Sequence, residues 1–100
     1  TVVSRPAKDR AVLDSGRKTQ NPDHETPLVK GHPGAEVVRV SAEHCELNLS
    51  GESQNLKIGD KLELIPGYAD FTTVLHDQFY GFRGERLEVV WPIQGRGKLQ

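Results

Sequence analysis

The sequence predicts a small, mostly β domain, built as an antiparallel barrel or sandwich. Short apolar runs alternate with polar residues along most of the chain, which is the pattern of half-buried strands. About eight such runs are separated by glycine, proline and other turn residues. No segment has helical periodicity over more than two turns. Since 100 residues are enough for one domain and too few for two, residues 1–100 are taken as a single domain.

The first two predicted strands cover residues 1–5 and 10–14, and the turn between them is Pro6-Ala7-Lys8-Asp9. A long irregular segment follows at residues 17–34, because it contains three prolines and two glycines. Structureless loops beyond about 12–15 residues are uncommon in compact domains. We therefore expect this loop to be either mobile or held by something, such as a partner domain missing from this chain.

The central strands are predicted at residues 35–40 and 45–49. In the first, Val38 and Val40 should share a face. The second alternates apolar and polar side chains, which places Cys45 among buried leucines as a small hydrophobe. Because it is the only cysteine, no internal disulfide can form, and this fits a reducing compartment.

The second half of the chain predicts four further strands, at residues 61–65, 70–76, 78–83 and 86–91. Polar turn residues precede the first of them, and Pro66-Gly67 ends it. The second is rich in threonine and valine, which suit a pleated surface. Gly84-Glu85 separates the last two and predicts a tight hairpin. The remaining residues, 92–100, should be surface chain, and Trp91 should lie in the core or at an interface.

The composition excludes several classes of protein. The formal net charge is −1, from 13 basic and 14 acidic side chains that are well mixed, which argues against nucleic-acid binding. No apolar stretch approaches the roughly 18 residues of a membrane span. No signal segment opens the chain, and we expect a cytoplasmic protein. Because the chain starts at Thr1 and contains no methionine, we expect a domain cut from a longer protein.

No complete catalytic motif is present. Residues 95–98 lack the third glycine and the strand–turn–helix context of a phosphate loop, and no Gly-x-Ser-x-Gly elbow occurs. None of the six lysines stands out as a Schiff-base former. Residues 14–18 predict a turn with Gly16 at positive φ. Glu43 and His44 should point to opposite faces of a strand. No role follows for His24 or His32.

The densest polar cluster lies at residues 66–77. Tyr68 and Asp70 face the same side of an extended chain, so they could converge on one metal ion. Asp70 is a good ligand for a hard cation, whereas a neutral phenol is a poor one. His76 would lie about 20 Å from Asp70 along a straight strand, too far to share an ion. His76 is otherwise expected in a strand-end turn, hydrogen-bonded to the backbone or to a carboxylate.

Taken together, several segments resemble the C-terminal domain of the D-threonine aldolase / D-serine dehydratase family. These are metal-activated pyridoxal-phosphate enzymes of the alanine racemase type (fold-type III). Each segment alone is weak, and the specificity lies in their ordered combination. The matching segments are residues 13–18, 41–44, 56–60, 65–77, 91–93 and 96–97.

The resemblance implies a division of labour. In that family an N-terminal α/β barrel binds pyridoxal phosphate and carries the Schiff-base lysine. The C-terminal β domain supplies a His-x-Cys or His-x-Asp pair for a divalent metal such as Mn²⁺ or Zn²⁺, which polarises the substrate's β-hydroxyl. The implied reaction is aldol cleavage or dehydration of a β-hydroxy-D-amino acid such as D-threonine or D-serine. The implied partners are the N-terminal barrel domain, a second copy in a homodimer and a small amino-acid substrate.

The sequence departs from the family at the metal pair, because Tyr68 stands at the position of the histidine. A phenol of pKa about 10 should weaken metal binding at neutral pH. Asp70 could bind the metal with waters and another residue, the enzyme could use no metal, or Tyr68 could act as an acid or base on the substrate. The resemblance implies Tyr68 and His76 as catalytic residues and Asp70 as the metal ligand. The residues implied to face substrate or cofactor are Asp14, Lys18 and His44.

Two alternatives remain open at this stage. A racemase on the same fold is a close variant. A self-sufficient β-barrel interaction module without catalysis is the rival from another class. The module predicts that the loop at residues 17–34 folds locally and that no apolar face is exposed. The lyase domain predicts an exposed apolar patch of more than a few hundred Å² where the barrel docks, and no activity of the isolated chain.

Overall fold

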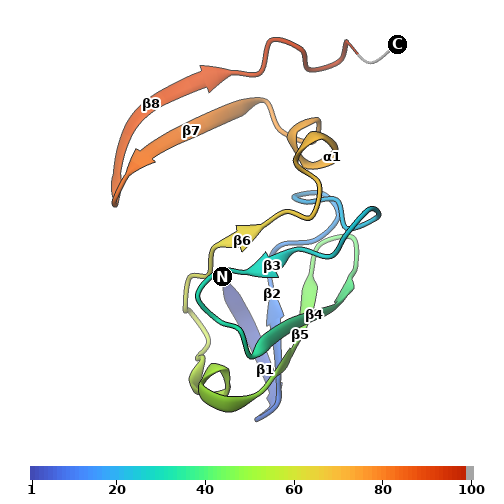
Figure 1. Ribbon diagram of the computed structural model, residues 1–100, viewed down its shortest axis with the longest axis vertical. Helices are drawn as coiled ribbons and strands as arrows, with labels where there is room; N and C mark the ends of the chain where they lie inside the picture. Colours follow the sequence, from blue (N-terminus) through green and yellow to red (C-terminus); the bar gives the residue numbers. More distant parts are fainter. Residues whose placement is uncertain (99–100) are drawn as a thin grey trace.

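The computed structural model describes residues 1–98 and confirms a mostly β protein. A curved sheet lies at one end of the molecule and a long hairpin at the other (Figure 1). In chain order the elements are β1 (Val2–Ala7), β2 (Arg10–Leu13), β3 (Leu28–Val29), β4 (Ala35–Val40), β5 (Cys45–Leu49), the 3-10 helix η1 (Gly51–Asn55), β6 (Leu64–Ile65), α1 (Ala69–Thr73), β7 (Gln78–Arg83) and β8 (Arg86–Pro92).

The strands pair as three separate antiparallel sheets, so residues 1–98 do not form one closed barrel. The main sheet has the order β1-β2-β5-β4, β3 pairs with β6, and β7 pairs with β8. Within the described part of the chain, no helix is both long and apolar enough to cross a bilayer.

The core lies on one face of the main sheet. Cys45 and Leu47 are 0% exposed, which confirms the predicted alternation of β5. Burial raises the pKa of the Cys45 thiol to about 11. No buried hydrophobic residue follows Leu56 within residues 1–98. The buried hydrophobic side chains are Val2, Ala11, Leu13, Val29, Ala35, Val37, Cys45, Leu47, Leu49 and Leu56.

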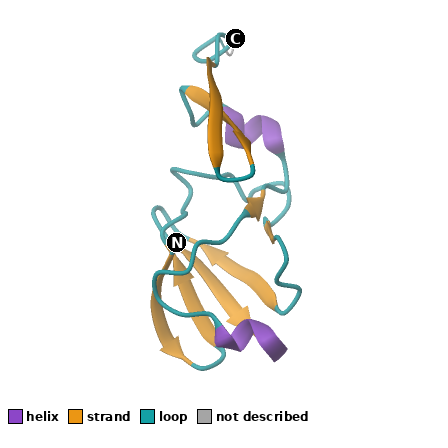
Figure 2. Cartoon of the chain, turned by 90° about the vertical axis from the view of Figure 1, so that its left-hand side faces the viewer, coloured by secondary structure: helices purple, strands orange, loops and turns teal. Residues whose placement is uncertain are grey.

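The β7–β8 hairpin confirms the predicted turn at Gly84-Glu85, where Gly84 has a φ of +59°. The hairpin extends away from the main sheet (Figure 2). Its exposed side chains define what we call the apolar hairpin surface. They are Phe79, Tyr80, Phe82, Leu87, Val90 and Trp91. Trp91 is 53% exposed and therefore lies outside the core, and its predicted role at an interface stays a prediction.

Three local predictions were wrong. Residues 70–76 do not form a strand, because α1 occupies Ala69–Thr73 and hydrogen bonds within the segment continue as turns to His76. A bulge between Val37 and Arg39 shifts the register of β4, so Val38 is exposed while Val40 packs against the core. The predicted strand at residues 61–65 pairs only at its last two residues. The predicted surface tail is exposed up to Lys98 apart from a half-buried Ile93, and residues 99–100 lie outside the described part.

Candidate functional site

The long loop predicted at residues 17–34 contains β3, and its first part is fixed to the main sheet. We call residues 16–27 the anchored loop. Gly16 packs so closely on the β4–β5 turn that a Cβ atom would lie 2.4 Å from the Cα of Glu43. The N–H groups of the next two residues donate to the carbonyls of Ser41 (2.8 Å) and Ala42 (3.1 Å). Gly16 lacks the predicted positive φ, so close approach is what requires a glycine here.

The other end of the anchored loop contacts the segment around α1. A Cβ atom on Gly67 would lie 2.3 Å from the carbonyl oxygen of Glu25. The backbone N–H of Asn21 donates to the hydroxyl of Thr72 at 3.2 Å. These contacts join residues more than 40 positions apart in sequence, so the loop is held by the chain itself.

Tyr68 and Asp70 come together where α1 begins. The phenol donates a hydrogen bond to Oδ2 of Asp70 at 3.1 Å. Tyr68 is extended and precedes the helix, while Asp70 lies in its first turn, so the pair meets without a strand. The ring of Phe71 packs edge-on against Tyr68 with centroids 4.7 Å apart, and the ring of His24 lies 5.1 Å away.

The same contact controls the protonation of Tyr68. Its hydrogen bond to Asp70, followed by the charge of that carboxylate, raises the pKa of the phenol above its ordinary value of 10.0. A phenol is already protonated at neutral pH, and this shift moves its titration further from neutrality, so Tyr68 presents a hydroxyl. Both side chains are exposed, so a partner or substrate can reach them.

His76 follows α1 and contacts the anchored loop. Its Nε2 atom lies 2.7 Å from the carbonyl oxygen of Thr19 in the anchored loop. A carbonyl only accepts hydrogen bonds, so Nε2 carries the proton in this contact. The imidazole is half-buried and joins the segment after α1 to the loop.

The other predicted site residues lie in the anchored loop or beside its start. Lys18 forms an ion pair with Glu43 at 2.5 Å, and this contact lowers the pKa of the Glu43 carboxyl. His44 lies in the β4–β5 turn rather than on a strand, with its side chain exposed. Asp14 instead lies just after β2 with its side chain exposed, and its backbone N–H donates to the carbonyl of Thr1 at 3.1 Å.

The structure thus brings Tyr68 and Asp70 into direct contact and connects them through the anchored loop to His76 and Lys18. Sequence reasoning missed two members of this region, His24 and Asn21. Both contact residues more than 40 positions away, which no local pattern reveals.

The donor set near Asp70 does not make a complete metal site. Among residues 1–98, no group of three or more His, Cys, Asp or Glu side chains could hold a metal ion. A hard cation takes about six oxygen ligands, and Asp70 with a protonated phenol offers few of them. Nor do these residues fit pyridoxal phosphate, because all six lysines are exposed and none has the apolar surroundings of a Schiff-base lysine.

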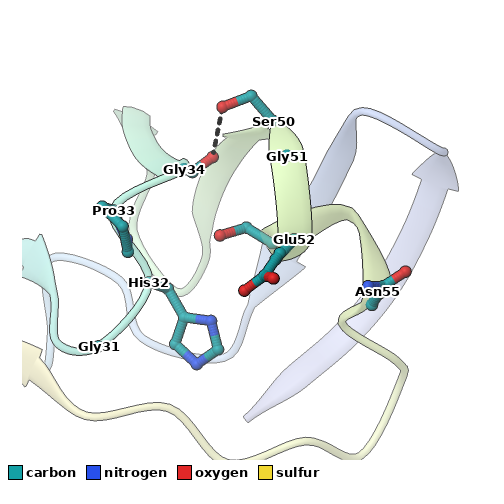
Figure 3. Close-up of a pocket in the computed structure, with 9 residues that line it drawn as sticks. Gly31, His32, Pro33, Gly34, Ser50, Gly51, Glu52 and Asn55 are labelled. Atoms are coloured by element: carbon teal, nitrogen blue, oxygen red, sulfur yellow. Dashed lines mark hydrogen bonds between the residues drawn. The ribbon is translucent and has the colours of Figure 1, made fainter.

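A separate polar hollow of about 490 Å³ lies between the β3–β4 connection and η1. His32 and Glu52 both point into it, and Ser50 donates a hydrogen bond to the carbonyl of Gly34 at 3.4 Å (Figure 3). It contains none of the residues predicted for the site.

Known proteins match this chain over most of its length. The family described as "Putative serine dehydratase domain" matches residues 1–82. The chain is 37% identical over 98 residues to a 3-hydroxy-D-aspartate aldolase of Paracoccus denitrificans. It is 34% identical over 97 residues to a D-threonine aldolase of Arthrobacter sp. These matches cover 98% and 97% of this chain and only 25% and 26% of the relatives, so the chain spans about a quarter of their length.

A solved structure gives the same result. The crystal structure of D-threonine aldolase from Filomicrobium marinum matches with a TM-score of 0.89 and 33% identity, covering 99% of this chain and 27% of that one. The family match covers the anchored loop, the two segments that this loop joins, and the Tyr68–Asp70 pair. The chain therefore belongs to the serine dehydratase domain family.

Proposed function

We propose that the chain is the C-terminal domain of a pyridoxal-phosphate lyase, an aldolase or dehydratase, that acts on β-hydroxy-D-amino acids. The observation that carries this proposal is the fold match to a D-threonine aldolase over 99% of the chain. The substrates in the relatives' names, 3-hydroxy-D-aspartate and D-threonine, are both β-hydroxy-D-amino acids.

In this proposal the N-terminal barrel domain binds the cofactor and provides the Schiff-base lysine. The exposure of every lysine in this chain supports that division. A barrel domain covers the apolar hairpin surface, and it belongs either to the same chain or to the second subunit of a homodimer. Phe82 is 62% exposed and Tyr80 is 59% exposed, a degree of aromatic exposure typical of a docking surface. The enzyme works in the cytoplasm, where Cys45 stays reduced.

The Tyr68–Asp70 pair faces the β-hydroxyl of the substrate. In an aldol cleavage this hydroxyl loses its proton as the Cα–Cβ bond breaks, and pyridoxal phosphate held by the barrel would supply the electron sink for that bond. The Asp70 carboxylate accepts the proton, and the Tyr68 hydroxyl holds the carboxylate in place. Asp70 can also ligate Mn²⁺ or Zn²⁺ if the barrel and water provide the other ligands.

The remaining predicted residues act around this pair. His76 positions the loop through Thr19. Lys18, His44 and Asp14 would face the substrate or cofactor, which is the role that the family resemblance implies for them.

The interaction-module alternative receives mixed support. The anchored loop folds on the chain itself, as a self-sufficient module would require. The exposed hairpin surface is what such a module should lack. The lyase proposal accommodates both observations, since a pre-folded domain can still dock through its hairpin.

The test uses the full-length protein, which should carry a barrel of about 200 residues or more before this chain. D-threonine, D-serine and 3-hydroxy-D-aspartate are supplied separately with pyridoxal phosphate. Aldol cleavage releases glycine and an aldehyde, dehydration releases ammonia and a 2-oxo acid, and racemisation leaves the carbon skeleton intact and inverts only the α-carbon. Cleavage or dehydration is expected. It should fall at least about 100-fold in Asp70→Asn and stay unchanged in Glu88→Gln, a matched hairpin variant. No bond cleavage in any substrate would contradict the proposal.

A further inference from the structure

A second hollow lies directly beside Asp70, between α1 and the chain that follows β8. It has a volume of about 490 Å³. The chain after β8 returns past α1 (Figure 1), and the N–H of Ile93 donates to the carbonyl of Asp77 at 2.9 Å. The lining residues used below are Asp70, Thr73, Val74, Phe79, Ile93 and Arg96.

The lining combines one carboxylate, one guanidinium and an apolar wall. Arg96 forms a salt bridge through Nε with Oδ1 of Asp77 at 2.6 Å, which fixes the side chain. No partner for its two terminal amino groups is found within residues 1–98. A guanidinium held in this way presents a planar fork that matches a carboxylate. Val74, Phe79 and Ile93 supply the apolar contacts.

We propose that this hollow binds the carboxylate of a small hydroxy or amino acid. Arg96 pairs with the carboxylate, Asp70 accepts a hydrogen bond from the hydroxyl or ammonium group, and the carbon skeleton packs on Val74 and Phe79. The inference rests on the proposed function for its biological meaning, because it makes Arg96 the anchor of the substrate's carboxylate. The site itself is a property of this chain alone.

The structure also limits the affinity. The Arg96 side chain is 47% exposed, and ion pairs open to solvent contribute little. A dissociation constant on the order of 1 mM or weaker is expected for the chain without its barrel. This range is accessible to NMR titration.

The first experiment titrates the ¹⁵N-labelled 100-residue chain with D-threonine and, separately, with D-threoninamide, which has no carboxylate. D-threonine should shift the backbone signals of Val74, Phe79 and Arg96, and the amide should not. Arg96→Gln should weaken D-threonine binding about two- to fivefold, the ratio for an ion pair that is open to solvent. Arg83→Gln is the matched control, because Arg83 pairs with Glu88 on the hairpin and does not line the hollow. Unchanged Cys45 and Leu47 signals verify folding.

Equal affinity of the wild-type and Arg96→Gln chains, equal binding of the amide, or no binding at all would overturn the inference. The second experiment measures KM for D-threonine in the full-length enzyme with and without Arg96→Gln, and KM should rise about tenfold. Lyase activity with an unchanged KM would refute this site and leave the proposed function standing. If the chain binds D-threonine but the full-length protein has no lyase activity, the site stands and the proposed function is refuted.

Discussion

The contact between Gly16 and the β4–β5 turn permits a sharp test of the anchored loop. In Gly16→Ala the new methyl group would lie 2.4 Å from the Cα of Glu43, whereas carbon atoms in contact are about 3.5–4.0 Å apart. The loop must retreat by about 1 Å, and such overpacking costs about 1–3 kcal/mol. The retreat also stretches the two hydrogen bonds to Ser41 and Ala42, each worth about 0.5–1.5 kcal/mol. The free energy of unfolding should fall by about 2–4 kcal/mol.

Urea denaturation and thermal unfolding measure this loss. In a domain of this size each kcal/mol corresponds to about 4–8 °C, so Tm should fall by at least about 8 °C. Amide hydrogen exchange at Arg17 and Lys18 should accelerate more than exchange in β5. Gly95→Ala is the matched control, because its Cβ atom meets nothing within 4 Å and its φ is not positive. Equal stability of the two variants would refute the reasoning, as would unchanged exchange at both loop amides.

Three further predictions concern single side chains. Arg5 donates hydrogen bonds to backbone carbonyls of the β1–β2 turn and to that of Leu56, so Arg5→Ala should cost about 1–3 kcal/mol in urea denaturation. The pKa of the Cys45 thiol rises from 9.0 to about 11 on folding, so its contribution to stability should be constant below pH 9 and be lost between pH 9 and 11, and the slope of stability against pH in this window should be smaller in Cys45→Ala. Tyr68 should titrate above 10.0 in an ultraviolet absorbance titration, and Asp70→Asn should return its pKa to the ordinary value; a titration curve unaffected by the substitution would contradict the contact.

The strands were predictable where one residue pattern determines them. The alternation in residues 45–49 follows directly from burial of one face, and a two-residue turn with a glycine at positive φ defines the hairpin. α1 was not predictable, because five residues are too few to establish a helical period and its threonines favour strands. The bulge between Val37 and Arg39 likewise separates Val38 and Val40, which simple alternation places on one face.

The candidate site was predictable only in part. The prediction that Tyr68 and Asp70 lie together assumes a continuous extended chain. In the structure the start of α1 brings them together instead. The contacts of His24 and Asn21 depend on how a long loop folds back, which is a tertiary property. Arg96 belongs to a segment of the family resemblance and is otherwise expected in surface chain, because no residue pattern indicates that this turn lies against α1.

The position of the core has a consequence for how such a domain can diversify. All the buried hydrophobic side chains among residues 1–98 lie between Val2 and Leu56, whereas Tyr68, Asp70 and Arg96 occupy exposed chain beyond it. Substitutions around the hollow therefore alter ligand contacts without opening cavities in the hydrophobic centre. A library that randomises residues 68–96 while keeping the main sheet should yield many folded variants, and ligand preference could then be selected almost independently of thermal tolerance.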